Sequence, residues 1–363
     1  MGSAGPHDAG TVPSTALQVS CEEVFHFRAA QSHLGNRLPP GSFRDAAWGA
    51  LQDSSPRAAL LSLHARLEGV GPGSWEDPAL WQIWLRMADY VVPRQDFGVF
   101  TLGALPRAPG PASALVAVGE AVREIVGDQS LPSRDVAAAL ARRPNLDDRT
   151  RHHPRWVMQE ACVSGRYRIR WDARTVAVMA APVPDVDPEE ARQELARRFL
   201  HWHGPATPRQ FASWAHLPLV DAVETWRVLA PELLPVAAGG ELRQVLVRDE
   251  ERLRQALPVA SVRLVPFSDP VFALDRNLLF PAADGAGPSR DERGSPVTPR
   301  LRNSLTGRVL VDGVAVGSWG RREHQLLIWL WEPADPAVRE RVTAEAATFG
   351  GPAGRPVEIR WLT

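Results

Sequence analysis

The spacing of apolar residues changes along the chain between the 3.6-residue period of helices and the two-residue period of strands, and Gly and Pro mark the breaks. These changes predict a loose tail over residues 1–18 and four folded segments, at residues 19–110, 111–187, 188–260 and 261–363. No run of about 18 apolar residues occurs, so the pattern predicts no membrane-spanning helix.

The first segment predicts a mixture of helices and strands. Helices are expected over Glu22–Leu34, Ser42–Leu51 and Asp77–Met87, and a strand over 89–92. The run Arg57–Leu67 fits either a short helix or a pair of strands.

The second and third segments repeat one order of elements. Helices over Ser133–Arg142 and Pro154–Val163 precede strands over Tyr167–Trp171 and Thr175–Met179. The third segment predicts three helices and then a hairpin around Gly239-Gly240; the helices are expected over Glu189–His203, Arg209–Ala215 and Leu219–Leu229. Helices followed by a hairpin are the order that a winged helix needs.

The fourth segment changes to a β-rich pattern. Gly307–Val316 alternates around Asp312-Gly313, which is a strong hairpin signal. Further strands are expected over Gln325–Trp331 and Pro356–Leu362, with one helix over Pro333–Phe349. The predicted fold class is therefore α+β, with three tandem winged-helix modules and a small C-terminal β-barrel.

Composition limits the chemistry. All 41 basic side chains are Arg and none is Lys, so Schiff-base catalysis by a lysine amine and a Walker-type phosphate lysine are excluded. Only two cysteines occur, Cys21 and Cys162, far apart in sequence, and this number excludes a disulfide framework or a Cys-based zinc site; the cytoplasm fits this usage. His201 and His203 are two residues apart on a predicted helix and make a poor metal pair. We expect no metal and no cofactor.

Arginine is concentrated in the second segment. Because the net charge is only −1, any contact with DNA has to come from a local basic surface. Arg at alternating positions of a hairpin projects from one side, as phosphate contacts require. A solvated face without a ligand remains the alternative. The candidate DNA-binding residues of this cluster are Arg151, Arg155, Arg166, Arg168, Arg170 and Arg174.

Four runs of sequence resemble one known family. Ala196–Trp214, which contains His201-Trp202-His203-Gly204-Pro205, resembles the most recognisable stretch of the AlkZ/YcaQ-like winged-helix proteins. Ala50–Asp53, Val265–Pro270 and Val309–Trp319 resemble further stretches of that family, in the same order. The resemblance thus extends over nearly the whole chain.

The resemblance implies three winged helices and a C-terminal β-barrel around a DNA channel. It also implies monofunctional DNA glycosylases that remove bulky alkylated purines and unhook interstrand crosslinks. Their catalytic motif, Gln-apolar-Gln or Gln-apolar-Asp, positions the water that attacks C1′. Here the aligned run is Gln52-Asp53-Ser54, which departs from the motif at its second and third positions. A serine hydroxyl does not bridge two partners as a carboxamide does.

Gln52 and Asp53 are the candidate catalytic residues, and Arg86 is a further candidate for the DNA-binding cleft. The alternative for the first two is a polar turn that caps the end of a helix. Two hypotheses follow: a DNA glycosylase acting on alkylated bases, or a catalytically silent DNA-binding or self-resistance protein on the same scaffold. Both predict binding to duplex DNA. A transcription regulator would need a dimer, and because no dimerisation helix is recognisable we expect a monomer.

Overall fold

The computed structural model describes residues 16–363 except 55–56, 276–289, 292–293, 299–302 and 334. Residues 1–15 of the predicted tail therefore lie outside the described residues. Leu17–Val19, at the end of that tail and the start of the first segment, form strand β1, which pairs in parallel with a strand of the third segment.

The first segment contains more strand than its sequence predicts. Its elements are β1 (Leu17–Val19), α1 (Cys21–Gln31), α2 (Phe43–Ala46), β2 (Leu51–Gln52), α3 (Ala58–Arg66), β3 (Leu80–Leu85), β4 (Ala88–Pro93) and α4 (Phe97–Leu102). The helix predicted over Asp77–Met87 is wrong, because Leu80–Leu85 pairs with β4 as an antiparallel hairpin. Five of its six residues are buried, which hides the two-residue period of a strand. The helix predicted over Ser42–Leu51 ends early, and Ala50 has a left-handed backbone.

The second and third segments follow the predicted order closely. The second contains α5 (Pro109–Val126), β5 (Ser130–Pro132), α6 (Ser133–Leu140), α7 (Asp148–His152), α8 (Pro154–Ala161), β6 (Tyr167–Trp171) and β7 (Val176–Ala180). The third contains α9 (Pro188–His203), α10 (Pro208–Ala215), α11 (Leu219–Leu229), β8 (Leu233–Ala238), β9 (Glu241–Leu246) and α12 (Glu250–Arg254). The start of α10 is fixed by a capping box between Thr207 and Gln210, with Pro208 at the first helical position.

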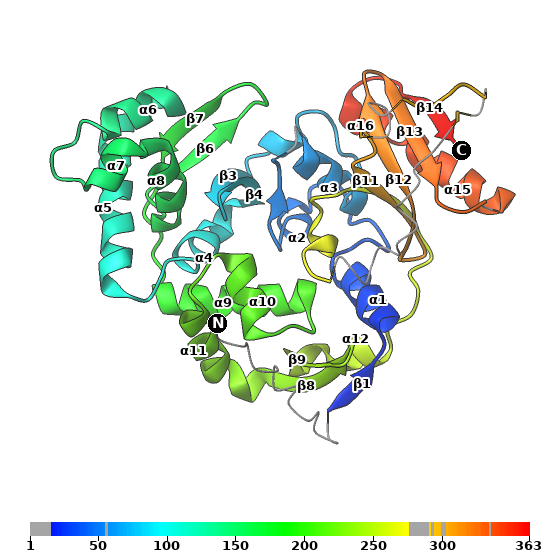
Figure 1. The fold of residues 1–363 in the computed structure, drawn as a ribbon, viewed down its shortest axis with the longest axis horizontal. Helices are drawn as coiled ribbons and strands as arrows, with labels where there is room; N and C mark the ends of the chain where they lie inside the picture. The colour runs from blue at the N-terminus through cyan, green and yellow to red at the C-terminus, as the bar shows by residue number, and fades with distance from the viewer. Residues whose placement is uncertain (1–15, 55–56, 276–289, 292–293, 299–302, 334) are drawn as a thin grey trace, which may run out of the picture.

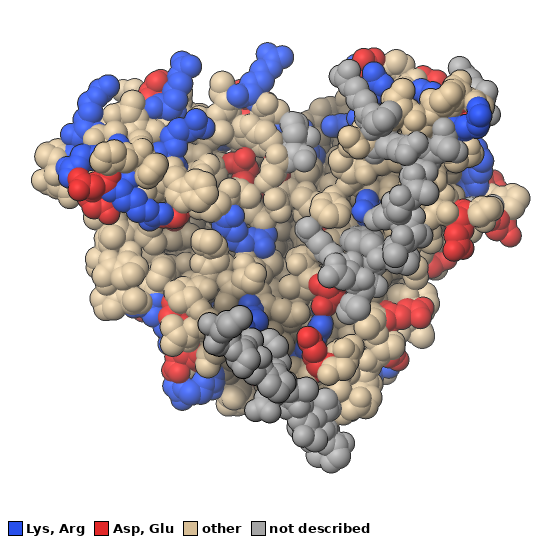
Figure 2. Space-filling model, viewed as in Figure 1, with Lys and Arg blue, Asp and Glu red and all other residues tan. Residues whose placement is uncertain are grey.

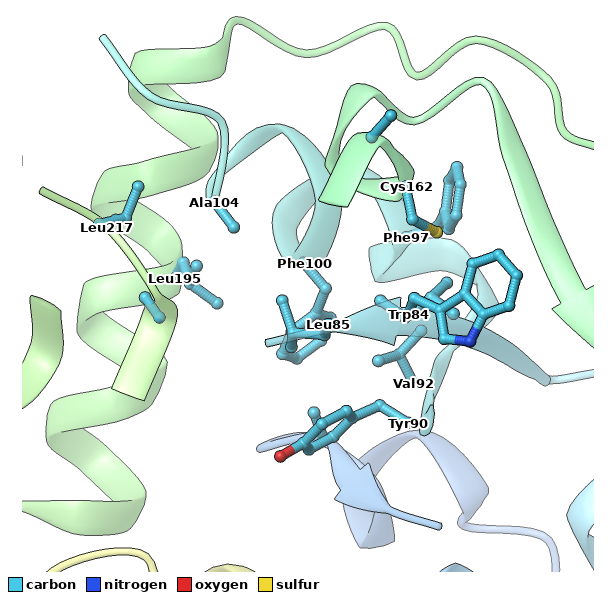
Figure 3. Packing of buried hydrophobic residues seen from close by; sticks show 14 of the residues in the cluster. Trp84, Leu85, Tyr90, Val92, Phe97, Phe100, Ala104, Cys162, Leu195 and Leu217 are labelled. Atoms are coloured by element: carbon cyan, nitrogen blue, oxygen red, sulfur yellow. The ribbon is translucent and has the colours of Figure 1, made fainter. Parts of the chain in front are cut away.

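The sheets cross the predicted segment boundaries. A six-stranded sheet in the order β2-β4-β3-β6-β7-β5 combines strands of the first and second segments, and β1-β8-β9 combines the N-terminal strand with the third. One large cluster of buried residues joins the three segments, and Figure 3 shows part of it, including Trp84, Cys162, Leu195 and Leu217. The first three segments are thus held together by a shared core.

The C-terminal segment forms an open sheet with a helix on one face. It contains β10 (Val262–Pro266), β11 (Gly307–Val311), β12 (Val314–Arg322), β13 (Gln325–Leu330), α15 (Pro336–Ala347), α16 (Gly350–Ala353) and β14 (Glu358–Leu362). Within the described residues the order is β10-β11-β12-β13-β14, and no pairing joins the two outer strands. The expected closed barrel is corrected to an open sheet. Val342 and Ala346 of α15 pack against Leu264 and Ile328 of the sheet, so a helix covers the face that a barrel would enclose.

The arrangement in space has two lobes (Figure 1). One lobe consists of α5–α8 with the β6–β7 hairpin, the other is the C-terminal sheet, and β3, β4 and α3 lie between them. Figure 2 shows a notch in the outline of the molecule between the lobes and basic side chains gathered on the first. Among the described helices, none has the length and apolar character needed to cross a membrane.

Candidate active site and nucleic-acid interface

Gln52 lies on the short edge strand β2. Leu51 pairs with Val91 and Gln52 with Tyr90, and the amide of Asp53 donates to the carbonyl of Asp89 at 2.8 Å. The ladder is therefore regular through Asp53. Since neighbouring strand residues face opposite sides, Gln52 faces one side of the sheet and Asp53 the other.

The half-buried side chain of Gln52 lines a pocket of about 840 Å3. The pocket lies between the β2–α3 region and the C-terminal sheet, and pockets of this size hold small organic groups. Its described lining residues are Gln52, Ser54, Ala58, Leu61, Pro266, Phe267, Ser268, Ser304, Leu305, Thr306, Arg308, Trp319 and Arg321.

Both ends of the Gln52 carboxamide are hydrogen bonded. Its Nε2 donates to Ser54 Oγ at 2.9 Å, and its Oε1 accepts from the Tyr90 hydroxyl at 3.1 Å. Arg86 Nη2 in turn donates to the Tyr90 hydroxyl, and the Arg86 guanidinium lies 5.0 Å from the centre of the Trp214 ring. The structure thus connects Arg86 with Gln52 through Tyr90, which no sequence motif singles out.

Asp53 occupies a different environment. Its side chain is fully buried, with Oδ1 accepting from the amide of Ala59 at 2.9 Å and Oδ2 accepting from Arg57 and Gln82 at 3.3 and 3.4 Å. Burial raises the pKa of Asp53 to about 6, although the Ala59 amide and the Arg57 guanidinium act in the opposite direction. The carboxylate caps the first turn of α3 and does not line the 840 Å3 pocket.

Five of the seven arginines predicted to bind DNA divide into two groups. Three make ion pairs: Arg151 with Asp148, Arg166 with Glu120 and Arg170 with Glu76. Arg155 and Arg174 are exposed, and neither makes an ion pair with a described residue.

The other two, Arg168 and Arg86, lie against aromatic rings. Arg168 lies 5.0 Å from the Trp81 ring centre, with Arg94 at 5.1 Å from the same ring, and burial together with Arg94 lowers the pKa of Arg168. Arg86 lies beside Gln52. The seven arginines therefore do not form one continuous unpaired surface.

Several pocket residues were not predicted. Phe267 lies within the run Val265–Pro270 that carries the family resemblance, so that run contained a signal. Tyr90 and Arg321 had no comparable signal, because only strand register brings Tyr90 to Gln52 and only the approach of the C-terminal sheet brings Arg321 to the pocket. Within the described part of the chain, no three His, Cys, Asp or Glu side chains form a group able to hold a metal ion.

The fold is α+β, with a pocket at Gln52 and basic side chains gathered on one lobe (Figure 2). The sequence profile described as "DNA glycosylase AlkZ-like" matches residues 46–351, and the chain belongs to this AlkZ-like DNA glycosylase family. The resemblance identified from sequence is confirmed.

A solved structure has the same fold. The DNA glycosylase AlkZ of Streptomyces sahachiroi is 19% identical to this chain, with a TM-score of 0.73 over 95% of this chain and 100% of that one. A comparison with curated protein sequences gives no match.

Proposed function

We propose that the protein is a monofunctional DNA glycosylase that binds duplex DNA as a monomer and hydrolyses the N-glycosidic bond of bulky alkylated purines, including those in interstrand crosslinks. The observation that carries the proposal is the position of Gln52. The chain belongs to the AlkZ-like family, and two hydrogen bonds hold the Gln52 carboxamide at a pocket large enough for an extruded base.

The chemistry fits a carboxamide better than a strong base. A purine alkylated at N7 carries a positive charge and leaves as a neutral base, so the leaving group needs no proton. The bond between C1′ and the base breaks, the oxygen of a water bonds to C1′ of the oxocarbenium-like sugar, and the water proton passes to solvent. Gln52 Oε1 has a second lone pair that can hold this water, and preorganised dipoles stabilise the developing charge. Without lysine, Schiff-base strand cleavage by a side-chain amine is excluded.

Asp53 supports the site from the opposite side of the strand. Its buried carboxylate fixes the start of α3, whose residues Ala58 and Leu61 line the pocket. We assign Gln52 the direct role and Asp53 the role of holding the strand and helix in register.

DNA binding is proposed for the helix-and-hairpin units, which we interpret as winged helices at residues 19–110, 111–187 and 188–260. Arg155 and Arg174 are free to contact phosphates. The ion pairs of Arg151 and Arg170 are partly exposed, and exposed pairs contribute about 1 kcal/mol or less, so a phosphate can replace the carboxylate at little cost. Arg166, directly before β6, and Arg168, on β6, are proposed as secondary contacts.

One observation favours the second candidate, a catalytically silent DNA-binding protein. Among the described residues that line the 840 Å3 pocket, none is Asp or Glu, and Ser54 stands where the family motif has Gln or Asp. This protein would bind duplex DNA with the same arginines and leave the glycosidic bond intact.

One substrate distinguishes the glycosylase from the silent DNA-binding protein. Duplex DNA carrying a single N7-methylguanine is incubated with the protein, and free base is measured by chromatography beside a protein-free control that corrects for spontaneous depurination. Retention of the same duplex is measured by gel shift. Release together with retention supports the glycosylase. Retention without release selects the silent binder, and loss of both removes the DNA-directed proposal.

A further inference from the structure

The hydrogen bonds from Arg86 through Tyr90 to Gln52 have a defined direction. A guanidinium only donates, so the Tyr90 hydroxyl accepts from Arg86 and has its own proton to give. That proton goes to Gln52 Oε1. A reversed carboxamide would leave the Tyr90 proton facing a donor, and the Tyr90 side chain is buried, with 3% of its surface exposed. The chain therefore selects one orientation of the Gln52 carboxamide.

Arg86 is placed by an unusual turn. Arg86 and Met87 connect β3 to β4, and both have left-handed backbones, with φ of 53° and 61°. Two-residue turns of this kind strongly favour Asn and Gly, so the two side chains here are accommodated at a conformational cost. The turn places the guanidinium 4.7 Å from the Tyr90 ring centre and against Trp214 of α10.

A small cavity lies where these side chains meet. It measures about 70 Å3, enough for water, and its lining includes Gln52, Arg86, Tyr90, Trp214 and Asp269. In Figure 3 the Tyr90 ring lies near Val92, with its hydroxyl oxygen directed away from that residue. Tyr90 thus joins the rigid core to the polar cavity beside Gln52.

We infer that Tyr90 and Arg86 are positioning residues, which act through Gln52 by directing its Oε1 toward Tyr90 and its Nε2 toward Ser54. This inference rests on the proposed glycosylase function. The donor end of the carboxamide is then held at Ser54, and Oε1 keeps a lone pair for water. Ser54, at the third position of the motif, serves as the acceptor for Nε2 in place of a second catalytic amide.

The test uses the only two tyrosines of the chain. Tyr90→Phe keeps the ring and removes the hydroxyl, and the single-turnover rate of base release is expected to fall about 10-fold, as for one lost hydrogen bond of ordinary strength. Retention of the duplex should not change. Tyr167→Phe is the matched control, because that hydroxyl is also buried and donates to the Met158 carbonyl, away from Gln52. Its release rate should equal that of the wild type.

The Gln52→Ala variant distinguishes a positioning role of Tyr90 from a purely structural one. In Gln52→Ala, the additional change Tyr90→Phe should not slow release further, because the residue through which it acts is gone. A further 10-fold loss there, or a wild-type rate for Tyr90→Phe in the intact background, overturns the inference while the glycosylase function stands. If the wild-type protein releases no base, the proposed function fails and the inference fails with it.

Arg86 provides an independent check. Arg86→Lys keeps a donor for the Tyr90 hydroxyl, whereas Arg86→Met removes it. We expect Lys to retain several-fold more activity than Met when both rates are measured with the duplex saturated by protein. Equal rates for the two variants would exclude Arg86 from the hydrogen-bonded chain.

Discussion

Replacing Asp53 by Asn tests the environment assigned to this carboxylate. The amide keeps an acceptor for the Ala59 amide group and removes the charge, so the cap on α3 can persist. Burial raises the pKa of Asp53 to about 6 from an ordinary value of 3.8. The folded protein therefore holds this proton more tightly than the unfolded chain, and the difference corresponds to about 3 kcal/mol.

Stability therefore falls as the pH rises. A raised carboxyl pKa gives stability that is fully present below about pH 3.8 and is lost as the pH rises through about 6. From about pH 4.5 to about pH 7.5, the free energy of unfolding of the wild type should fall by about 2 kcal/mol relative to Asp53→Asn, because the variant lacks this titration.

Urea unfolding at these two pH values measures the difference directly, and Asp128→Asn, at an exposed carboxylate, serves as the control. A stability difference between wild type and Asp53→Asn that stays constant within about 0.5 kcal/mol across this range would refute the buried environment. At about pH 7.5 the Asn variant should also release base within a few-fold of the wild-type rate. A loss of 100-fold would place the carboxylate in the reaction.

Three further outcomes follow from the structure. Arg155→Ala should reduce the slope of log K for duplex DNA against log salt by about 1, measured by fluorescence anisotropy; an unchanged slope would remove this arginine from the interface. Arg66→Met breaks a fully buried, bidentate pair with Asp269 at 2.7 Å and should lower the free energy of unfolding by about 3–5 kcal/mol; a loss below about 1 kcal/mol would contradict this burial. Burial raises the pKa of Cys162 to about 12, so a thiol reagent near pH 8 should modify only Cys21 in the folded protein and both cysteines after unfolding; rapid reaction of both would contradict the packing around Cys162.

Much of the local structure could be predicted from sequence where turn and cap residues mark the ends of elements. The third helix of residues 188–260 matches its expected bounds, Leu219–Leu229, and the hairpin at Asp312-Gly313 forms as expected. The strand Leu80–Leu85 was mistaken for a helix because the sheet is covered on both faces, so the alternation that identifies a strand is missing. Whether the C-terminal sheet closes into a barrel depends on where α15 packs. The local spacing of apolar residues does not encode this packing.

The candidate site was predictable only in part. The family resemblance selected Gln52, and the structure places it at the pocket, but the same resemblance could not show that Asp53 turns away from it. That distinction depends on strand register, which reverses the face of every second residue. Tyr90 was missed for the same reason, since it meets Gln52 only through the pairing of β2 with β4. Ion pairs such as that of Arg170 with Glu76 join residues far apart in sequence. The clustering of arginines in the sequence therefore predicts more unpaired basic surface than the structure has.

The proposed role of Gln52 is to hold the water that attacks C1′. Its most direct test is the single-turnover rate of base release from an N7-methylguanine duplex, with protein in excess, for the wild type and Gln52→Ala. Gln325→Ala, on β13 and hydrogen bonded to Glu358, is the matched control. We predict that Gln52→Ala lowers the rate about 100-fold or more at unchanged duplex retention, while Gln325→Ala behaves as the wild type. Equal rates for Gln52→Ala and the wild type would contradict the account.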